Sequence, residues 1–168
     1  MIKVLNSGKV YKIAQIVMKI GIAADHGGFS LKQHLLHILE ADGYHITDFG
    51  AKSLDQQDDY PDYVAPLARA VAGGLVDRGI AICGSGVGAA IVANKFKGVR
   101  AALITETYSA HQGVEHDELN LICLGGRVIG PELAKEITFA FLHARYSGEG
   151  RHQRRLDKLA RIENDSFK

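Results

Sequence analysis

The 168-residue chain carries 20 lysines and arginines against 19 aspartates and glutamates, a formal net charge of +1. This balance provides no overall basic field that would attract nucleic acid or an anionic membrane, so we expect neither as a partner. The length fits one domain, whose core is large enough to be stable without disulfide cross-links. The two cysteines, Cys83 and Cys123, form no CxxC pair, which favours reduced thiols and a cytoplasmic location.

Residues 1–17 differ in composition from the rest of the chain, because they contain three lysines and no acidic residue. Their apolar stretches are too short for a signal-peptide core or a membrane span. We interpret residues 1–17 as an N-terminal extension or arm, with Met18 as an alternative start of the protein.

From Met18 onward, apolar runs alternate with segments of helical period, the pattern of a parallel sheet covered on both faces. Strands are predicted near 19–24, 44–49, 79–83, 99–104 and 121–124. The fold class is therefore α/β, a three-layer, doubly wound, five-stranded parallel sheet of the Rossmann-like or flavodoxin-like kind. The commonest strand order at this size is 2-1-3-4-5.

Six helices are predicted between and after these strands. In the first, Ser30 is the expected N-cap and Gly43 the stop signal. The second, near 62–73, requires Pro66 to lie in the first turn. The others are predicted at 89–95, at 108–115, from Pro131 onward, and in a polar C-terminal tail at 151–168.

The most informative motif is an apolar run that ends at Cys83 and is followed directly by the loop Gly84–Gly88, in which three glycines are spaced by single residues. Glycines allow a tight turn and let backbone N–H groups approach an anion. Ligands of doubly wound sheets bind where the winding reverses, here between strands 1 and 3. The loops at that place are Asp25–Gly28 and Cys83–Gly88, so we expect them to form one crevice.

Several motifs, taken in their order and spacing, resemble ribose-5-phosphate isomerase B over roughly residues 18–165. They are Gly21–Gly28, Asp59–Pro61, Cys83–Gly88, Ala93–Lys95 and Arg151–Arg155. The wider family also includes allose-6-phosphate and galactose-6-phosphate isomerases. The resemblance implies interconversion of aldose and ketose sugar phosphates without a metal or organic cofactor. It also implies a homodimer or homotetramer in which residues of two chains form each active site.

The resemblance also implies roles for individual residues. Cys83 is the expected catalytic base, and His116 is expected to open the sugar ring. The expected substrate-binding residues are Asp25, His26, Gly84, Ser85, Gly86, Val87, Gly88, Asp117, Arg127, Arg151 and Arg155. Of these, the glycine loop is expected to hold the enediolate, and the three arginines are expected to bind the phosphate. Residues 18–150 are accordingly the isomerase domain, and residues 151–168 form a helix that contributes two of these arginines.

At one of these positions the chain departs from the family. Many members carry asparagine where this chain has Asp117. A carboxylate still accepts a hydroxyl hydrogen bond but has no amide donor, and it adds negative charge near an anionic intermediate. This difference bears on the preferred sugar more than on the reaction.

Other interpretations of the same residues remain open. The segment Gly84–Ala89 satisfies the G-x-G-x-x-G/A fingerprint of dinucleotide-binding domains, although it follows the third strand and not the first. Cys83 and His116 would also suit a hydrolase with covalent catalysis. Taken alone, Cys83 could be a small core residue, and His116 or the arginines could belong to a solvated surface. The histidines lack the spacing of metal ligands, so no metal is expected.

Overall fold

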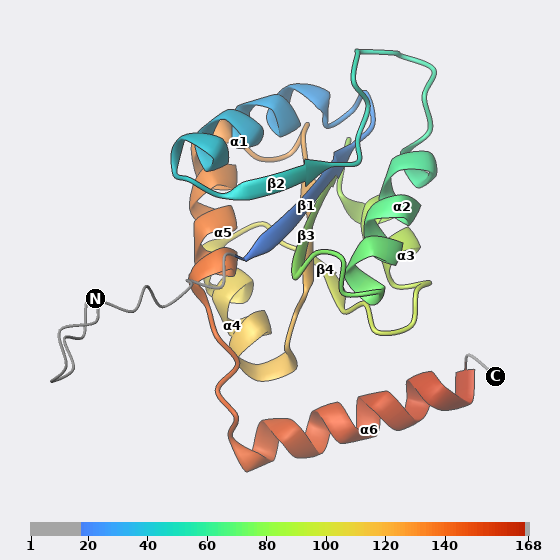
Figure 1. The fold of residues 1–168 in the computed structure, drawn as a ribbon, viewed down its shortest axis with the longest axis vertical. Helices are drawn as coiled ribbons and strands as arrows, with labels where there is room; N and C mark the ends of the chain where they lie inside the picture. Colours follow the sequence, from blue (N-terminus) through green and yellow to red (C-terminus); the bar gives the residue numbers. More distant parts are fainter. Residues whose placement is uncertain (1–17, 167–168) are drawn as a thin grey trace, which may run out of the picture.

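The computed structural model describes residues 18–166, so the expected N-terminal arm at 1–17 lies outside the described residues. Five strands and six helices follow one another in this part of the chain (Figure 1). The strands are β1 (Lys19–Ala24), β2 (His45–Asp48), β3 (Arg78–Cys83), β4 (Ala101–Leu103) and β5 (Leu121–Gly125). The helices are α1 (Phe29–Ala41), α2 (Tyr60–Ala72), α3 (Val87–Ala93), α4 (Thr107–Asp117), α5 (Pro131–His143) and α6 (Gly150–Ser166).

The strands form one parallel sheet in the order β2-β1-β3-β5-β4, which confirms the fold class but corrects the predicted order of the last two strands. Burial explains the exchange. All residues of β5 are buried, whereas β4 has only three residues and none of them is fully buried. A strand that is apolar on both faces belongs inside a parallel sheet, and a short, half-exposed strand is tolerated at its edge.

Helices cover both faces of the sheet, as predicted. On one face α1, α4 and α5 pack around Leu35, Ile82 and Phe141. On the other face α2 and α3 pack around Leu67, Ala81 and Cys123. Each face therefore has its own apolar core, and the sheet between them is buried on both sides.

Two details of the helices differ from the sequence-based expectation. The N-cap of α1 is Gly28 and not Ser30, and its backbone C=O accepts a hydrogen bond from the Lys32 N–H at 2.9 Å. Pro66 lies inside α2 and not in its first turn, because α2 begins earlier, at Tyr60. The strong apolar face of α2, with Val64 and Leu67 fully buried, holds the helix together despite the missing proline N–H.

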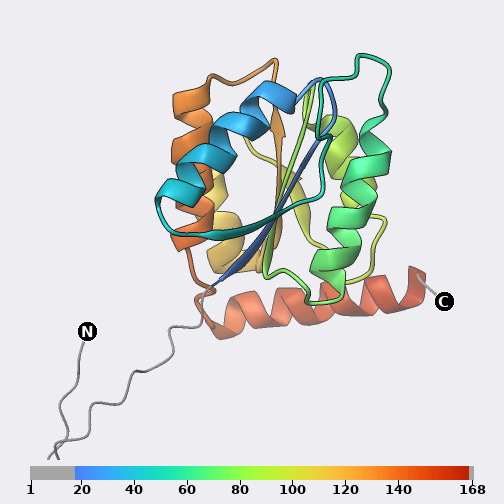
Figure 2. The same ribbon diagram turned by 45° about the horizontal axis from the view of Figure 1, so that its top comes forward.

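The C-terminal helix α6 crosses below the sheet, at the end where the strands begin (Figure 2). It is anchored by His152 and Leu156, its two buried residues, and by the Glu163 carboxylate, which accepts the Gly98 N–H at 2.6 Å. Its apolar edge continues into Leu159 and Ile162, which are 45% and 63% exposed. Within residues 18–166, none of the helices is both long and apolar enough to cross a membrane.

Candidate functional site

Three loops meet at the carboxyl edge of the sheet, where the winding reverses between β1 and β3. They are Asp25–Gly28 after β1, Cys83–Gly86 after β3 and Gly125–Val128 after β5. The Gly126 N–H donates to the Cys83 carbonyl at 2.8 Å, and the Arg127 N–H donates to the Gly84 carbonyl at 3.0 Å. The third loop lies here because β5, and not β4, is the neighbour of β3.

Glycines allow these loops to pack backbone against backbone. A Cβ atom on Gly27 would lie 2.7 Å from the Gly84 nitrogen, and one on Gly126 would lie 2.6 Å from the Gly27 carbonyl oxygen. No side chain fits in such a space. The first loop is thus wedged between the other two, and the predicted approach of Asp25–Gly28 to Cys83–Gly88 is present in the structure.

Cys83 is the last residue of β3 and is 4% exposed. Its Sγ atom accepts the Gly86 N–H at 3.1 Å. Gly86 adopts a left-handed φ of 81° in this turn, a conformation that glycine adopts without strain. The sulfur at the end of β3 thus lies beside a backbone hydrogen-bond donor of the glycine loop.

A hollow opens directly beside this sulfur. It is lined by Asp25, Tyr60, Cys83, Gly84, Ser85, Gly88, Arg127 and Val128. Six of these residues were predicted from the sequence, whereas Gly86 and Val87 do not line the hollow. Tyr60 and Val128 were missed as site residues, although Tyr60 belongs to the motif Asp59–Pro61. The tyrosine ring covers Gly88 so closely that a Cβ there would lie 2.7 Å from the ring.

A hydrogen-bonded network of Asp25, His26 and Asp58 adjoins the hollow. The Asp58 carboxylate lies 2.7 Å from the His26 Nδ1 atom and accepts the His26 backbone N–H at 2.9 Å. That bond to Asp58 raises the pKa of His26. Burial raises the pKa of Asp25, which lines the hollow. Among the described residues, these three form the only group of three or more histidine, cysteine or acidic side chains whose ligand atoms all lie within 4.8 Å of one another.

Three of the remaining predicted residues, His116, Arg151 and Arg155, form a second cluster around His152. The His116 ring, near the end of α4, stacks on the His152 ring with centroids 3.9 Å apart. The Gln112 amide lies 2.6 Å from the Nδ1 atom of His116, and the Nε atom of Arg151 donates to the Nε2 atom of His152 at 3.0 Å. Asp117 ends α4, and Arg155 lies in α6, close enough for its charge to act on His152.

This second cluster lies at the end of the sheet opposite to Cys83. The helix α4 ends just before Leu121, which begins β5 and pairs with Gly79, whereas Cys83 pairs with Gly125 at the other end of β5. Four residue steps of strand separate these ends, or ~13 Å. Within one chain, Arg127 therefore lies with Cys83, and His116, Asp117, Arg151 and Arg155 do not.

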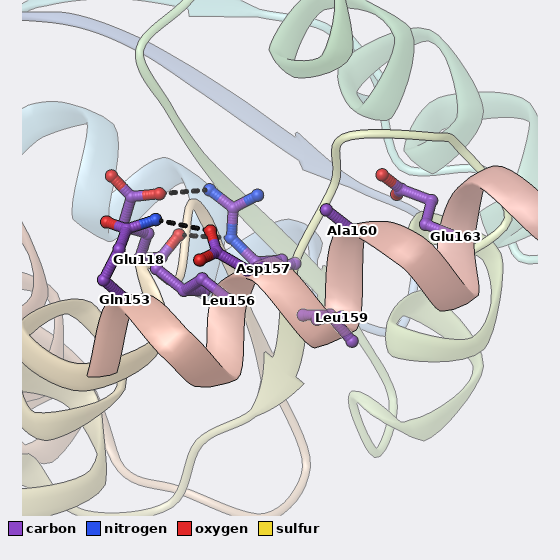
Figure 3. Close-up of a pocket in the computed structure, with 8 residues that line it drawn as sticks. Glu118, Gln153, Leu156, Asp157, Leu159, Ala160 and Glu163 are labelled. Carbon is purple, nitrogen blue, oxygen red and sulfur yellow. Dashed lines mark hydrogen bonds and ion pairs between the residues drawn. The ribbon is translucent and has the colours of Figure 1, made fainter. Parts of the chain in front are cut away.

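A further hollow separates part of α6 from the rest of the molecule (Figure 3). Gln153, Asp157 and Glu163 line it from α6, and Arg100 and Glu118 line it from the loops that flank β4 and α4. Its polar groups pair with one another, for example Gln153 with Asp157 at 2.9 Å and Arg100 with Glu118 at 3.4 Å. We therefore assign it no ligand, but it shows that α6 is incompletely packed on its own chain.

Comparison with known proteins places this geometry in a family. Residues 20–159 match the family described as Ribose/Galactose Isomerase. A ribose-5-phosphate isomerase B of Escherichia coli is 47% identical over 145 residues, which cover 86% of this chain and 96% of that protein. A D-erythrulose-4-phosphate isomerase of Pectobacterium atrosepticum is 42% identical over 134 residues, or 80% of this chain and 88% of that protein.

Solved structures agree. The ribose-5-phosphate isomerase B of Clostridium thermocellum superposes with a TM-score of 0.85 at 44% identity, covering 89% of this chain and 99% of that chain. The enzyme of Mycoplasma genitalium, solved with bound ribulose 5-phosphate, gives a TM-score of 0.84 at 39% identity and the same coverage. The resemblance deduced from the sequence motifs is thus confirmed across the α/β domain, and the chain belongs to the ribose/galactose isomerase family.

Proposed function

We propose that this protein interconverts ribose 5-phosphate and ribulose 5-phosphate without a cofactor, and that Cys83 is the catalytic base. The observation that carries the proposal is the Cys83 sulfur, which receives a backbone N–H at 3.1 Å and faces a hollow lined by a buried carboxyl group and an arginine. The relatives named as ribose-5-phosphate isomerases, including one solved with ribulose 5-phosphate, support the choice of substrate.

The chemistry follows from these groups. The Cys83 thiolate removes the proton from C2 of the open-chain aldose, the C–H electron pair forms the C1–C2 double bond, and the carbonyl oxygen takes the negative charge of an enediolate. The C2 hydroxyl proton then moves to the C1 oxygen, and the proton held by the sulfur is delivered to C1, which leaves the ketose carbonyl at C2. The backbone amides of the loop residues that line the hollow, Gly84, Ser85 and Gly88, would stabilise the intermediate oxyanion. Asp25, whose pKa is raised by burial, suits proton exchange with the hydroxyl groups.

We further propose that a second copy of the chain completes each site with its own His116, Asp117, Arg151 and Arg155. In this arrangement His116 opens the sugar ring, and the two arginines bind the phosphate together with Arg127 of the first chain. Arg151 and Arg155 stand one helical turn apart in α6, so both guanidinium groups can face one phosphate.

Apolar surfaces support this assembly. Val87 and Ile91 on α3 are 48% and 57% exposed, and Leu103 on the edge strand β4 is 39% exposed. Val87 belongs to the glycine loop, Ile91 follows one helical turn later on α3, and Leu103 lies beside the loop, since a Cβ on Gly86 would lie 2.5 Å from Leu103. Together with the exposed edge of α6, this surface is suited to burial against a second copy.

One observation favours a second sugar as an alternative substrate. A relative that is 42% identical is a D-erythrulose-4-phosphate isomerase. The rates for ribose 5-phosphate, D-erythrulose 4-phosphate, allose 6-phosphate and galactose 6-phosphate should therefore be compared side by side. We expect ribose 5-phosphate to be converted fastest, and similarly low rates on all four would contradict the proposed function.

The role of Cys83 has its own test. Cys83→Ala should lower isomerisation by about 10²–10⁴-fold while leaving phosphate binding intact. Cys123→Ala is the matched control, because Cys123 is also buried but lies inside the sheet. In heavy water the wild type should incorporate deuterium at the sugar carbon without a covalent adduct on sulfur. A trapped acyl or phosphoryl group would indicate a hydrolase instead, and stabilisation by a nicotinamide dinucleotide would indicate a binding module.

A further inference from the structure

His26 is held at two atoms by one carboxylate from a distant part of the chain. Asp58 Oδ1 accepts the His26 backbone N–H at 2.9 Å and lies 2.7 Å from the ring Nδ1 atom, although the two residues are 32 positions apart. An ionised carboxylate only accepts hydrogen bonds. The Nδ1 atom must therefore carry the proton in this contact, and Nε2 is the ring nitrogen that remains free.

The surroundings keep Asp58 in that ionised form. The Asp58 side chain is 6% exposed and that of His26 is 24% exposed, so water competes little for the carboxylate. Burial opposes ionisation of Asp58, but the hydrogen bonds from the backbone and ring of His26 outweigh it and hold its pKa below the ordinary value. Asp25, the other charged group that acts on the ring, also favours a proton on His26.

The position of His26 connects this contact with the proposed site. His26 lies between Asp25, which lines the hollow beside Cys83, and Gly27, which is wedged against Gly84. The backbone at His26 is thus fixed by its neighbours, and its ring is fixed by Asp58. What remains to be determined is which ring nitrogen carries the proton, and the contact of Asp58 with Nδ1 places the proton on Nδ1.

We propose that Asp58 is a positioning residue of the isomerase site, which holds His26 in the Nδ1–H form and leaves Nε2 to contact the sugar phosphate. The identity of the ligand rests on the proposed function, whereas the tautomer does not. Asp58 acts through His26 and needs no contact with the substrate itself.

The experiment compares Asp58→Asn with Asp59→Asn in the full-length protein. An asparagine at position 58 can still accept the His26 backbone N–H through its oxygen, but it no longer offers a charged acceptor to Nδ1. Asp59 is exposed, and its side chain forms no capping hydrogen bond with α2, so its variant removes the same charge without touching His26. Nitrogen-15 spectra of the histidine rings, with His26 assigned by its loss in His26→Gln, report the tautomer directly.

We expect Nδ1–H in the wild type and in D59N, and a substantial share of Nε2–H in D58N. The kcat/KM for ribose 5-phosphate should fall by about tenfold in D58N and stay unchanged in D59N. If the wild-type spectrum shows His26 in the Nε2–H form, the proposal is overturned by that spectrum alone. It is also overturned if D58N has the same His26 tautomer and the same kcat/KM as D59N. If the tautomer behaves as expected but none of the four sugar phosphates is converted, the proposed function fails and the assignment of the His26 tautomer stands.

Discussion

Cys83 and His116 lie at opposite ends of the five-stranded sheet. Cys83 ends β3 at the carboxyl edge, and His116 lies in the last turn of α4, at the edge where β5 begins. One chain therefore cannot bring the proposed base and the proposed ring-opening residue to the same sugar. Two copies in a symmetric pair can do so, because each then presents one edge to the other.

Mixing two inactive variants tests this arrangement. Cys83→Ala and His116→Ala should each lose about 10²–10⁴-fold in activity, since each removes one proton-transfer group. After the two are unfolded together and refolded, half of the dimers are mixed, and each mixed dimer has one site with both groups intact. The mixture should regain about one quarter of the wild-type activity.

The control for this experiment is a mixture in which both chains carry Cys83→Ala, which should regain nothing. Differently tagged chains establish that mixed dimers form. Mixed dimers without recovered activity would contradict the shared site, and a fully active monomer in sedimentation would contradict the assembly.

The glycine loop gives a prediction about stability. Gly86 and Gly98 share a left-handed backbone, with φ of 81° and 85°, but a Cβ on Gly86 would lie 2.5 Å from Leu103 whereas a Cβ on Gly98 would meet nothing within 4 Å. Gly98→Ala should cost about 1–2 kcal/mol in unfolding free energy from backbone strain alone. Gly86→Ala should cost about 1–3 kcal/mol more from overpacking.

Urea unfolding of both variants separates the two contributions, because the backbone strain is common to both. Gly86→Ala should also lower isomerase activity, since Gly86 donates its N–H to the Cys83 sulfur. Equal losses of stability in the two variants would show that the loop relaxes around the added methyl group.

The sequence was enough to predict the sheet, but the order of its last two strands was predicted wrongly. Alternating apolar runs predicted all five strands, and the reversal between β1 and β3 follows from that pattern. The order of β4 and β5 depends on which strand is buried on both faces. Leu121–Gly125 contains no polar residue, whereas the segment near β4 contains Arg100, so composition did hold a signal for the observed order.

The candidate site was only partly predictable for a related reason. Asp25 directly follows β1 and Cys83 ends β3, and strand ends at a winding reversal can be placed from sequence. Asp58 comes from the long connection between β2 and α2, and Tyr60 is the first residue of α2. Only tertiary packing brings these two residues to the hollow and its network. The separation of His116 from Cys83 could in principle have been predicted from the sequence. The end of a helix that comes just before a strand must lie at the amino end of that strand.

Asp117 gives a prediction about substrate affinity. It is exposed at the end of α4, close to the residues proposed to bind an anionic substrate. Asp117→Asn removes negative charge and should lower the KM for ribose 5-phosphate by about two- to fivefold, with the difference shrinking at high salt. Asp157→Asn is the matched control, because Asp157 is also exposed but accepts a hydrogen bond from Gln153 beside the other hollow. Equal KM values for all three proteins would exclude Asp117 from the site.

His152 gives a prediction about pH. It is 1% exposed, and burial, reinforced by the charges of His116 and Arg151, holds its pKa below the ordinary value of 6.5. At acidic pH, His152 therefore binds a proton more readily in the unfolded chain than in the folded protein. The contribution of His152 to stability is present above about pH 6.5 and is lost as the pH falls below that value toward the lower pKa of the folded state.

Replacing His152 by Phe keeps an aromatic ring against His116 and removes the titration. The fall in unfolding free energy between about pH 7.5 and about pH 5.5 should therefore be smaller in His152→Phe than in the wild type. His37→Phe, at an exposed position of α1, is the control and should keep the wild-type slope. Urea unfolding at both pH values measures the difference. If His152→Phe keeps the wild-type slope as well, His152 is not the buried neutral ring on which the stacked pair depends.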